Sequence, residues 1–384
     1  MSWEKVRLGD VTDSCLGKML DQHKNKGDLH PYLANINVRW GNFELDNLPQ
    51  MRFEDSENER YGIQYGDLIV CEGGEPGRCA IWKEQIPNMK IQKALHRIRV
   101  HDCLDYRYLY YWFLWAGKRG ELEQYFTGST IKHMPGEKLK SIVIDMPPLN
   151  TQRYIASILS AYDDLIENNQ KQIKLLEEAA QRLYKEWFVD LRFPGWENTK
   201  IVDGVPEGWE RLPLPQIADI QYGFAFDGSL FNSSGYGTPI VRIRNIPDAE
   251  TSDFTSEEAS SEYLINNGDI IVGMDGEFHI NSWAGGQAYL VQRTCCIRPK
   301  IEKIRGWLLY SIHEPIKYFE KTIVGATVAH LGKKHLDSIT LLVPTEELYA
   351  PFISIFDKRQ ILMEENIKLR EVRDRLVYVL MSTN

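Results

Sequence analysis

The sequence has no long apolar run and no cysteine framework, and each absence excludes a class of protein. None of its 384 residues lies in a stretch near the ~18 apolar residues that span a bilayer. The opening MSWEKVRLGD lacks the charged-then-apolar pattern of a secretory signal. We therefore expect a cytoplasmic protein. Neither disulfide nor C-x-x-C zinc spacing is present, which predicts reduced, mostly buried thiols at Cys15, Cys71, Cys79, Cys103, Cys295 and Cys296.

The sequence also lacks an excess of positive charge. It contains 45 Lys and Arg against 54 Asp and Glu, a net charge of −9 at pH 7. Domains that bind nucleic acid usually carry a basic face. Because the acidic excess is spread along the chain, any such face has to be assembled by folding. The length exceeds that of one ordinary core and predicts two domains plus connecting structure.

The most informative feature is that the chain repeats itself. WEKVRLGDVTD near the N-terminus resembles WERLPLPQIAD in the second half, and YGIQYGDLIVCEGG resembles YLINNGDIIVGMDG. Two further matches align Gln92 with Gln292 and His133 with His330. The four matches occur in the same order, and their offset falls only from 206 to 197 residues. This pattern indicates a duplication that covers nearly the whole chain.

A short motif raises the alternative of an enzyme. IDMPP, at Ile144–Pro148, resembles the Asp-Pro-Pro loop with which amino-methyltransferases grip a target amine. In the second copy, however, the position of Asp145 is occupied by Leu342. The candidate glycine-rich turn EGGEPG leads into a strand-like run instead of the helix that a cofactor-binding βαβ unit requires. We therefore interpret IDMPP as a strand end before a helix.

A long helical pattern follows each copy. The first carries an unbroken a/d stripe with steps of four and three, typical of a coiled-coil seam, at Ile155, Leu159, Tyr162, Ile166, Asn169, Ile173, Leu176, Ala180, Leu183 and Trp187. Residues 151–188 would form a rod of roughly 55 Å. Such a rod is a spacer or a docking surface.

The second helical pattern contains a matching polar position. Its stripe comprises Ile355, Leu362, Leu369, Val372, Leu376 and Val379. Asn366 aligns with Asn169, and a polar residue on an apolar seam selects one register, so the two asparagines are expected to hold the helices in one alignment. The alternative is that Asn366 faces solvent at the seam edge. Nearby arginines are interpreted as a solvated or partner-facing side: Arg359, Arg370 and Arg373.

In its order of variable domain, long helix, variable domain and long helix, the chain resembles the specificity subunit of a Type I restriction–modification enzyme. The segments that carry the resemblance are PPLNTQRYIASILSAYDDLIENNQKQIKLLEEAAQRLYKEWFVDLRFPG, VDGVPEGWE, GDLIV and GDIIVGMDGEF. The second copy departs from the family pattern at Thr345, where a second proline is usual, and at EELYAPF. This departure affects only the expected start of the last helix.

The resemblance implies an α+β fold with two tandem target recognition domains, each with a small curved β-sheet, separated by two long antiparallel coiled-coil helices. It divides the chain into a first recognition domain at 1–148, a helix at 149–190, a connector at 191–207, a second recognition domain at 208–345 and a second helix at 346–384.

The resemblance also implies a subunit without catalysis of its own. Each recognition domain would read one half of a split, asymmetric site in double-stranded DNA. The helices would dock two methyltransferase subunits, which translocating nuclease subunits then join. S-adenosylmethionine, ATP and Mg would be bound by those partners only, and no metal is expected here.

The sequence offers candidates for DNA contact, because Arg, Lys, Asn and Gln suit base edges and hydroxyl or cationic groups suit phosphates. In the first domain they are Asn35, Asn37, Arg39, Arg78, Gln92, Lys93, Thr130, Lys132 and His133. In the second they are Arg242, Arg244, Asn245, Asp275, His279, Gln292, Arg293, Thr327, His330 and Lys333. The glutamines and histidines recur in both copies, so we expect them to serve the shared fold or phosphate positioning and not the choice of half-site. Any of these residues could instead be solvated surface.

Two other function classes remain open from the residues. The chain could be a methyltransferase with a fused recognition domain, but the missing cofactor-binding turn argues against this hypothesis. It could also be a coiled-coil adaptor that binds protein, against which the polar loop clusters count.

Overall fold

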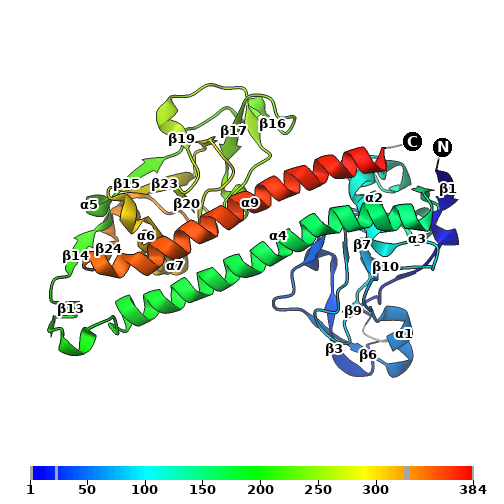
Figure 1. The fold of residues 1–384 in the computed structure, drawn as a ribbon, viewed down its shortest axis with the longest axis horizontal. Helices are drawn as coiled ribbons and strands as arrows, with labels where there is room; N and C mark the ends of the chain where they lie inside the picture. The colour runs from blue at the N-terminus through cyan, green and yellow to red at the C-terminus, as the bar shows by residue number, and fades with distance from the viewer. Residues whose placement is uncertain (1–2, 22–24, 324–328, 383–384) are drawn as a thin grey trace. The chain divides into compact units, whose positions relative to one another are not determined.

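The structure is a computed structural model that describes residues 3–21, 25–323 and 329–382. The chain divides into two compact units, one formed by Met1–Asp164 with Glu371–Asn384 and the other by Leu165–Arg370. Each unit contains one copy of the repeat and a segment of both long helices (Figure 1). Among the residues described, no helix is both long and apolar enough to cross a membrane.

The first unit is built on a four-stranded antiparallel sheet. Its strand order is β2-β10-β7-β8, with bounds Thr12–Leu16, Leu95–Val100, Leu68–Cys71 and Cys79–Ile81. A three-stranded sheet has the order β6-β3-β9, with bounds Gln50–Phe53, Asp28–Leu33 and Lys90–Ile91. Two strand pairs complete the sheets: β1 (Glu4–Arg7) with β11 (Val143–Met146), and β4 (Val38–Arg39) with β5 (Asn42–Phe43). The helices are α1 (Asn58–Tyr61), α2 (Tyr106–Lys118) and α3 (Gly136–Lys140).

The aromatic helix α2 forms much of this unit's core. Asp105 caps its N-terminus, since its carboxylate accepts hydrogen bonds from the backbone N–H groups of Arg107 at 2.9 Å and Tyr108 at 3.3 Å. The helix buries an almost continuous run of large side chains against the four-stranded sheet and against the ends of both long helices. This packing anchors the first module to the helix pair within its unit.

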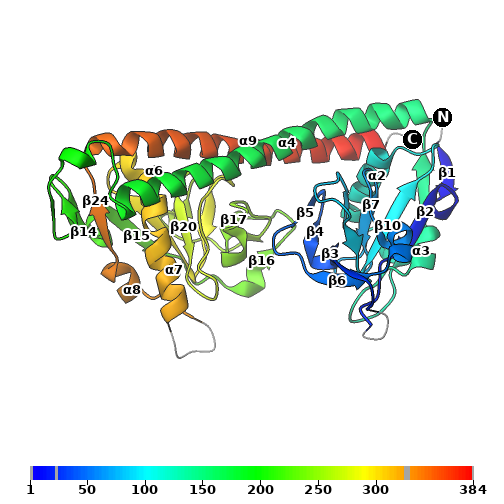
Figure 2. The same ribbon diagram turned by 90° about the horizontal axis from the view of Figure 1, so that it is seen from below.

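The second unit repeats the same topology. The sheet β15-β23-β20-β21 comprises Ala218–Tyr222, Thr294–Pro299, Ile270–Gly273 and Ile280–Ser282. The sheet β16-β18-β17-β22-β19 comprises Phe231–Asn232, Phe254–Thr255, Thr238–Val241, Ala288–Leu290 and Leu264–Ile265. Strand β14 (Glu210–Pro213) pairs with β24 (Thr340–Val343), and a hairpin of β12 (Ile201–Val202) and β13 (Val205–Pro206) precedes them. The short helices are α5 (Leu214–Ile217), α6 (Arg305–Ser311), α7 (His313–Thr322) and α8 (Lys333–Ser338). In Figure 2 these sheets lie on one side of this unit's long-helix segments.

Strand pairing confirms the duplication. The four-stranded sheets of the two copies have equivalent strand orders, β2-β10-β7-β8 and β15-β23-β20-β21. A parallel pair also recurs, as β3 with β9 and β17 with β22. The first and last strands of each module pair as well, because β1 with β11 corresponds to β14 with β24. Two copies of one α+β module therefore make up the chain, as the sequence predicted.

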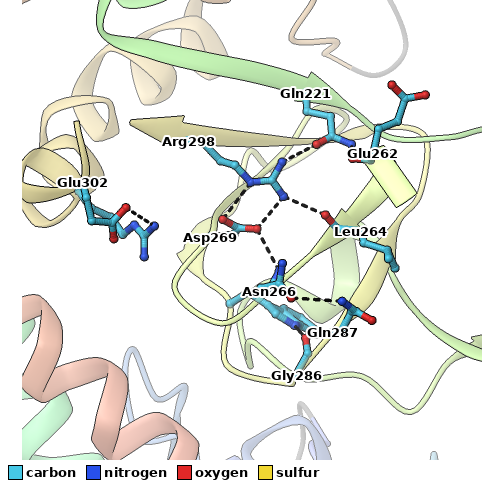
Figure 3. Close-up of polar contacts among 11 residues, drawn as sticks. Gln221, Glu262, Leu264, Asn266, Asp269, Gly286, Gln287, Arg298 and Glu302 are labelled. Carbon is cyan, nitrogen blue, oxygen red and sulfur yellow. Dashed lines mark hydrogen bonds and ion pairs between the residues drawn. The ribbon is translucent and has the colours of Figure 1, made fainter. Parts of the chain in front are cut away.

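A buried ion pair explains the repeated Gly-Asp before the central strand. In the second unit the carboxylate of Asp269 accepts from Arg298 at 2.7 and 3.1 Å and from the backbone N–H of Asn266 at 3.0 Å (Figure 3). Arg298 also donates to Gln221 at 2.6 Å. In the first unit Asp67, which is fully buried, accepts from Arg99 at 2.7 and 2.8 Å. The aspartate thus serves the fold of each module by fixing the turn before the central strand.

The motif IDMPP ends a strand, which confirms the structural interpretation. Asp145 lies in β11 opposite Lys5 of β1, with their charged atoms 3.1 Å apart. The two prolines follow, and α4 (Leu149–Tyr184) begins directly after them. A five-residue π-helical turn, Lys185–Val189, continues α4.

The two long helices are antiparallel in each unit. In the second unit Asn169 of α4 donates to Glu365 of α9 (Ala350–Met381) at 3.0 Å, while Glu177 lies 2.7 Å from Arg359. In the first unit Asp163 lies 2.6 Å from Arg373. Within the second unit, higher residue numbers on α4 therefore pair with lower residue numbers on α9. The predicted antiparallel pair is confirmed.

The seam of α4 is as predicted, but that of α9 is partly different. All ten residues of the first stripe are buried or half-buried. On α9 the prediction was wrong for Val372 and Val379, which are 42% and 59% exposed. The other four positions of the predicted stripe are buried or half-buried, as predicted: Ile355, Leu362, Leu369 and Leu376. A second seven-residue repeat also faces inward, formed by Arg359, Asn366 and Arg373. The interpretation of the arginines as solvated was therefore wrong for Arg359 and Arg373, since carboxylates compensate their charge inside the seam.

Candidate nucleic-acid interface

Three loops meet at one end of the central strand in each unit. They are the loop after that strand, the turn after the short parallel strand, and the loop that carries a histidine. In the first unit the backbone of Glu72 donates to Ala94 at 2.8 Å and accepts from Met134 at 2.7 Å. In the second unit Met274 makes the equivalent bonds to Arg293 at 2.9 Å and from Leu331 at 2.8 Å. We call the three loops of the first unit the first loop cluster and those of the second unit the second loop cluster.

Each loop cluster holds a histidine against a carboxylate. In the first, Nδ1 of His133 lies 3.4 Å from Glu72. In the second, Nδ1 of His330 lies 2.6 Å from Asp275, whose carboxylate also lies 3.1 Å from Arg293. The two histidine side chains are 45% and 48% exposed. Because the carboxylate engages Nδ1, Nε2 is the ring nitrogen available to an outside group.

The two carboxylates occupy different positions of the repeat. In the aligned sequences Glu72 corresponds to Met274, and Asp275 corresponds to Gly73. A bridge joins His133 to Gly73 and, in the same way, His330 to Asp275. The two copies therefore share the backbone arrangement, but the acidic residue that contacts the imidazole occupies adjacent positions of the repeat in the two copies. Glu72 was not among the candidates from the sequence.

The first loop cluster borders an open cavity of about 560 Å³. Two candidates from the sequence, Thr130 and Lys132, line it and are exposed. Two aromatic side chains that sequence reasoning missed, Trp40 and Phe126, line it as well. The ammonium of Lys132 lies 5.9 Å from the ring centre of Phe126. Lys132 also lies 3.6 Å from the carboxylate of Glu123, which lines the same cavity. A phosphate that replaced this carboxylate would lie beside aromatic faces on which a base can stack.

Other cationic candidates lie on the surface with acidic partners. Arg39 lies 2.8 Å from Glu44 and is 46% exposed, and Arg244 lies 2.5 Å from Asp253 and is 61% exposed. Both partners are exposed in the Arg39 pair, so water screens it and weakens it, whereas the side chain of Asp253 is only 15% exposed. Lys93, Gln292, Arg293 and Lys333 are exposed, whereas Gln92 is half-buried.

Three candidates are committed to the fold. The amide of Asn37, 6% exposed, accepts from the backbone of Ala34 at 2.9 Å and donates to that of Glu44 at 3.1 Å. Asn245 accepts from the backbone of Arg242 at 2.9 Å in the same way. Arg78 donates to Glu75 at 2.8 Å and to the backbone of Asn35 at 3.0 Å. These side chains shape their loops and leave little free for a ligand.

Asn35 of the first module is half-buried, and the other candidates belong to the second module. Arg242 lies with its guanidinium 5.6 Å from the ring of Phe231. His279 lies 3.7 Å from Glu277 and is 28% exposed. Thr327 lies outside the described residues. In the described part of the chain no three His, Cys, Asp or Glu side chains are grouped to hold a metal ion.

Comparison with protein families gives a match over most of the chain. The model of the Type I restriction modification DNA specificity domain matches residues 1–178 and 206–370, one match for each copy. The chain is 27% identical over 333 residues to the Type I restriction enzyme MjaIX specificity subunit of Methanocaldococcus jannaschii, covering 81% of this chain and 76% of that protein. It is 34% identical over 145 residues to the EcoBI specificity subunit of Escherichia coli, covering 38% of this chain and 30% of that protein.

A solved structure shares the fold. The S subunit of a Type I restriction-modification system from M. genitalium aligns with a TM-score of 0.54 and 17% identity, covering 99% of this chain and 96% of that one. The likeness confirms the α+β class with two tandem modules and long helices.

Proposed function

This chain belongs to the family of Type I restriction–modification specificity subunits, and from that premise we propose that each module reads one half of a split DNA target through its loop cluster. The two modules carry the same frame with different side chains, so their half-sites differ. Two tandem copies of one module can read two separated half-sites, as the two subunits of a dimeric protein do.

The observation that carries the proposal is the recurrence of the carboxylate-held, half-exposed histidine in both loop clusters. A side chain that served only the core would be buried, and one that served nothing would not keep a partner in both copies. In its cationic form, an imidazole that donates Nδ1–H to a carboxylate can donate Nε2–H to a phosphate oxygen, which fixes register without reading sequence. Residues that differ between the clusters, such as Lys132 with its aromatic neighbours and Arg244, are the candidates for base reading.

The long helices support the second part of the proposal, the docking of methyltransferase subunits. Both helices expose large apolar side chains: Tyr154, Leu165, Leu175, Ile361, Val372, Tyr378 and Val379 are each more than 40% exposed. Large apolar side chains exposed along a helix are available for contact with a protein partner. The chain would then contribute no catalysis. S-adenosylmethionine, ATP and Mg would lie on two methyltransferase and two nuclease partners, in the cytoplasm where the complex meets DNA.

Mapping of methylated adenines tests the proposal. A genome that carries this chain and its methyltransferase partner is compared with the same strain lacking this chain. The expected result is a split motif, two short unlike halves around unread bases, present only with the chain. A continuous motif, or methylation that survives the deletion, would contradict it. Methyl transfer to DNA by the isolated chain would instead support the fused-methyltransferase alternative.

A further inference from the structure

A second cavity lies in the first unit, away from the residues of its loop cluster. Its volume is about 540 Å³, and it lies between α1 and the segment that leads into β9. Amide side chains line it at Asn58, Gln64 and Asn88, and Lys90 of β9 contributes a cationic group. The size is that of a site for a small molecule.

Lys90 is the unusual member of this lining. Only 4% of the residue is exposed, and its Nζ lies 3.5 Å from the position that a Cβ on Gly62 would occupy. Across the described residues its ammonium has neither a hydrogen-bond acceptor nor a carboxylate partner. Burial lowers the pKa of this amine from its ordinary value. An ammonium withdrawn from water is costly unless an anion or hydrogen-bond acceptor replaces the water.

The neighbouring polar groups are already engaged. Arg97 donates to the backbone carbonyls of Glu59 at 2.8 Å and Gly62 at 3.1 Å. The guanidinium of Arg99 is held by Asp67 at 2.7 Å. The lining also includes the carboxylates of Glu59 and Glu84. Among the described residues neither of them is paired with Lys90, so its ammonium is left without an anionic partner, beside amides that can donate to a ligand.

The second copy shows that the module does not need this cation. Leu290 aligns with Lys90 and is fully buried. It belongs to a hydrophobic cluster with Trp283, whose indole N–H donates to the carbonyl of Gly286 at 2.6 Å. One fold thus accepts leucine at this position in one copy and a buried lysine in the other. Packing alone does not account for the lysine.

We propose that this cavity of the first module binds a small oxyanion, a phosphate, sulfate or carboxylate group, seated against Lys90 and the amides of Asn58, Gln64 and Asn88. The volume leaves room for the remainder of a small organic molecule that carries this group. The same chemistry is offered by a free anion and by a backbone phosphate of DNA, so the experiment has to separate these two sources.

Amine labelling of the full chain, followed by mass spectrometry at Lys90, gives the direct test. Labelling is carried out in chloride buffer of constant ionic strength, with inorganic phosphate or with a short DNA duplex as the probe. Protection of Lys90 by phosphate assigns the site to a free oxyanion. Protection by the duplex alone assigns it to the DNA backbone. If neither probe protects Lys90, the proposal is overturned.

Thermal unfolding gives an independent readout of a site for free phosphate. If phosphate protects Lys90, it should also raise the unfolding midpoint of the wild-type chain to a plateau. The unfolding midpoint of Lys90→Met should stay unchanged. Without phosphate, Lys90→Met should be at least as stable as wild type, because it removes an uncompensated cation. Leu290→Met, the matched change in the second copy, should respond to phosphate like wild type. An equal rise in Lys90→Met would overturn the assignment to Lys90.

Discussion

The guanidinium of Arg359 lies 2.7 Å from the carboxylate of Glu177, and only 5% of the arginine side chain is exposed. The same guanidinium donates to the hydroxyl of Ser282 at 2.7 Å and to the amide oxygen of Asn281 at 2.5 Å. It therefore joins α9 to α4 and to strand β21 of the second module. This arginine is part of the packing that fixes the module on its helices.

Replacing Arg359 by Met should destabilise the second unit by about 3 kcal/mol, because removal of one partner leaves buried polar groups uncompensated. Urea unfolding of the full chain, followed by tryptophan fluorescence, measures the loss. The matched control is Lys358→Met, an exposed position on the same helix, which should change stability by less than about 0.5 kcal/mol. Equal effects of the two substitutions would show that the network contributes little.

Substitution of the loop-cluster histidines should weaken DNA binding without altering the target. His133→Ala and His330→Ala each remove a proposed phosphate contact, so affinity should fall for every sequence alike and the salt dependence should decrease by about one ion. Filter binding of the complex with its methyltransferase partner, over a range of salt concentrations, measures both quantities. The methylated motif should stay the same.

The control for this experiment is His101→Ala. His101 is 43% exposed and lies 3.4 Å from Asp13, so it has a similar setting outside the loop clusters. It should leave affinity and salt dependence unchanged. A changed motif in His133→Ala or His330→Ala would instead assign the histidine to base reading.

The sequence was sufficient for the features that repeat. Duplicated strands, the strand end at IDMPP and the seam of α4 follow from periodicity and internal alignment, which are local signals. The seam of α9 was harder to predict, because a hydrophobic pattern places arginines such as Arg359 and Arg373 on the solvent-facing side. Their burial depends on Glu177, Asn281 and Asp163, which are distant in the sequence, and no local pattern reports such partners.

The loop residues show the same limit. Asn37 and Asn245 were taken as DNA-reading candidates because of their residue type, yet each binds the backbone three residues earlier. Their equivalent place in the two copies could have indicated a turn. The pairing of His133 with Glu72 was not readable from the alignment, because the carboxylate changes position between the copies.

Thiol reactivity should separate Cys103 from the other cysteines. Cys103 is exposed, whereas Cys71, Cys79, Cys295 and Cys296 are buried. Burial raises the pKa of Cys295 to about 12, so almost none of it is the reactive thiolate at neutral pH. Titration with a chromogenic disulfide should give one fast thiol in the native chain and the rest on unfolding. Cys103→Ser should abolish the fast phase, and its persistence would contradict the assignment.

The two seam asparagines should respond in opposite directions to Leu. Asn366 is 3% exposed, and its side-chain oxygen has no hydrogen-bond partner among the residues described. Asn366→Leu should therefore stabilise the chain by about 1 kcal/mol, because an unpaired buried acceptor is costly.

Asn169 is 5% exposed and donates to Glu365 at 3.0 Å, so Asn169→Leu should cost about 1 kcal/mol. Urea midpoints of the two variants measure both effects, and each variant is the other's control, since both place Leu at the equivalent position of a long helix. Stabilisation by both substitutions would mean that polarity at this position serves register and not stability. Destabilisation by both would mean that the amide of Asn366 contributes more through its packing than its unpaired oxygen costs.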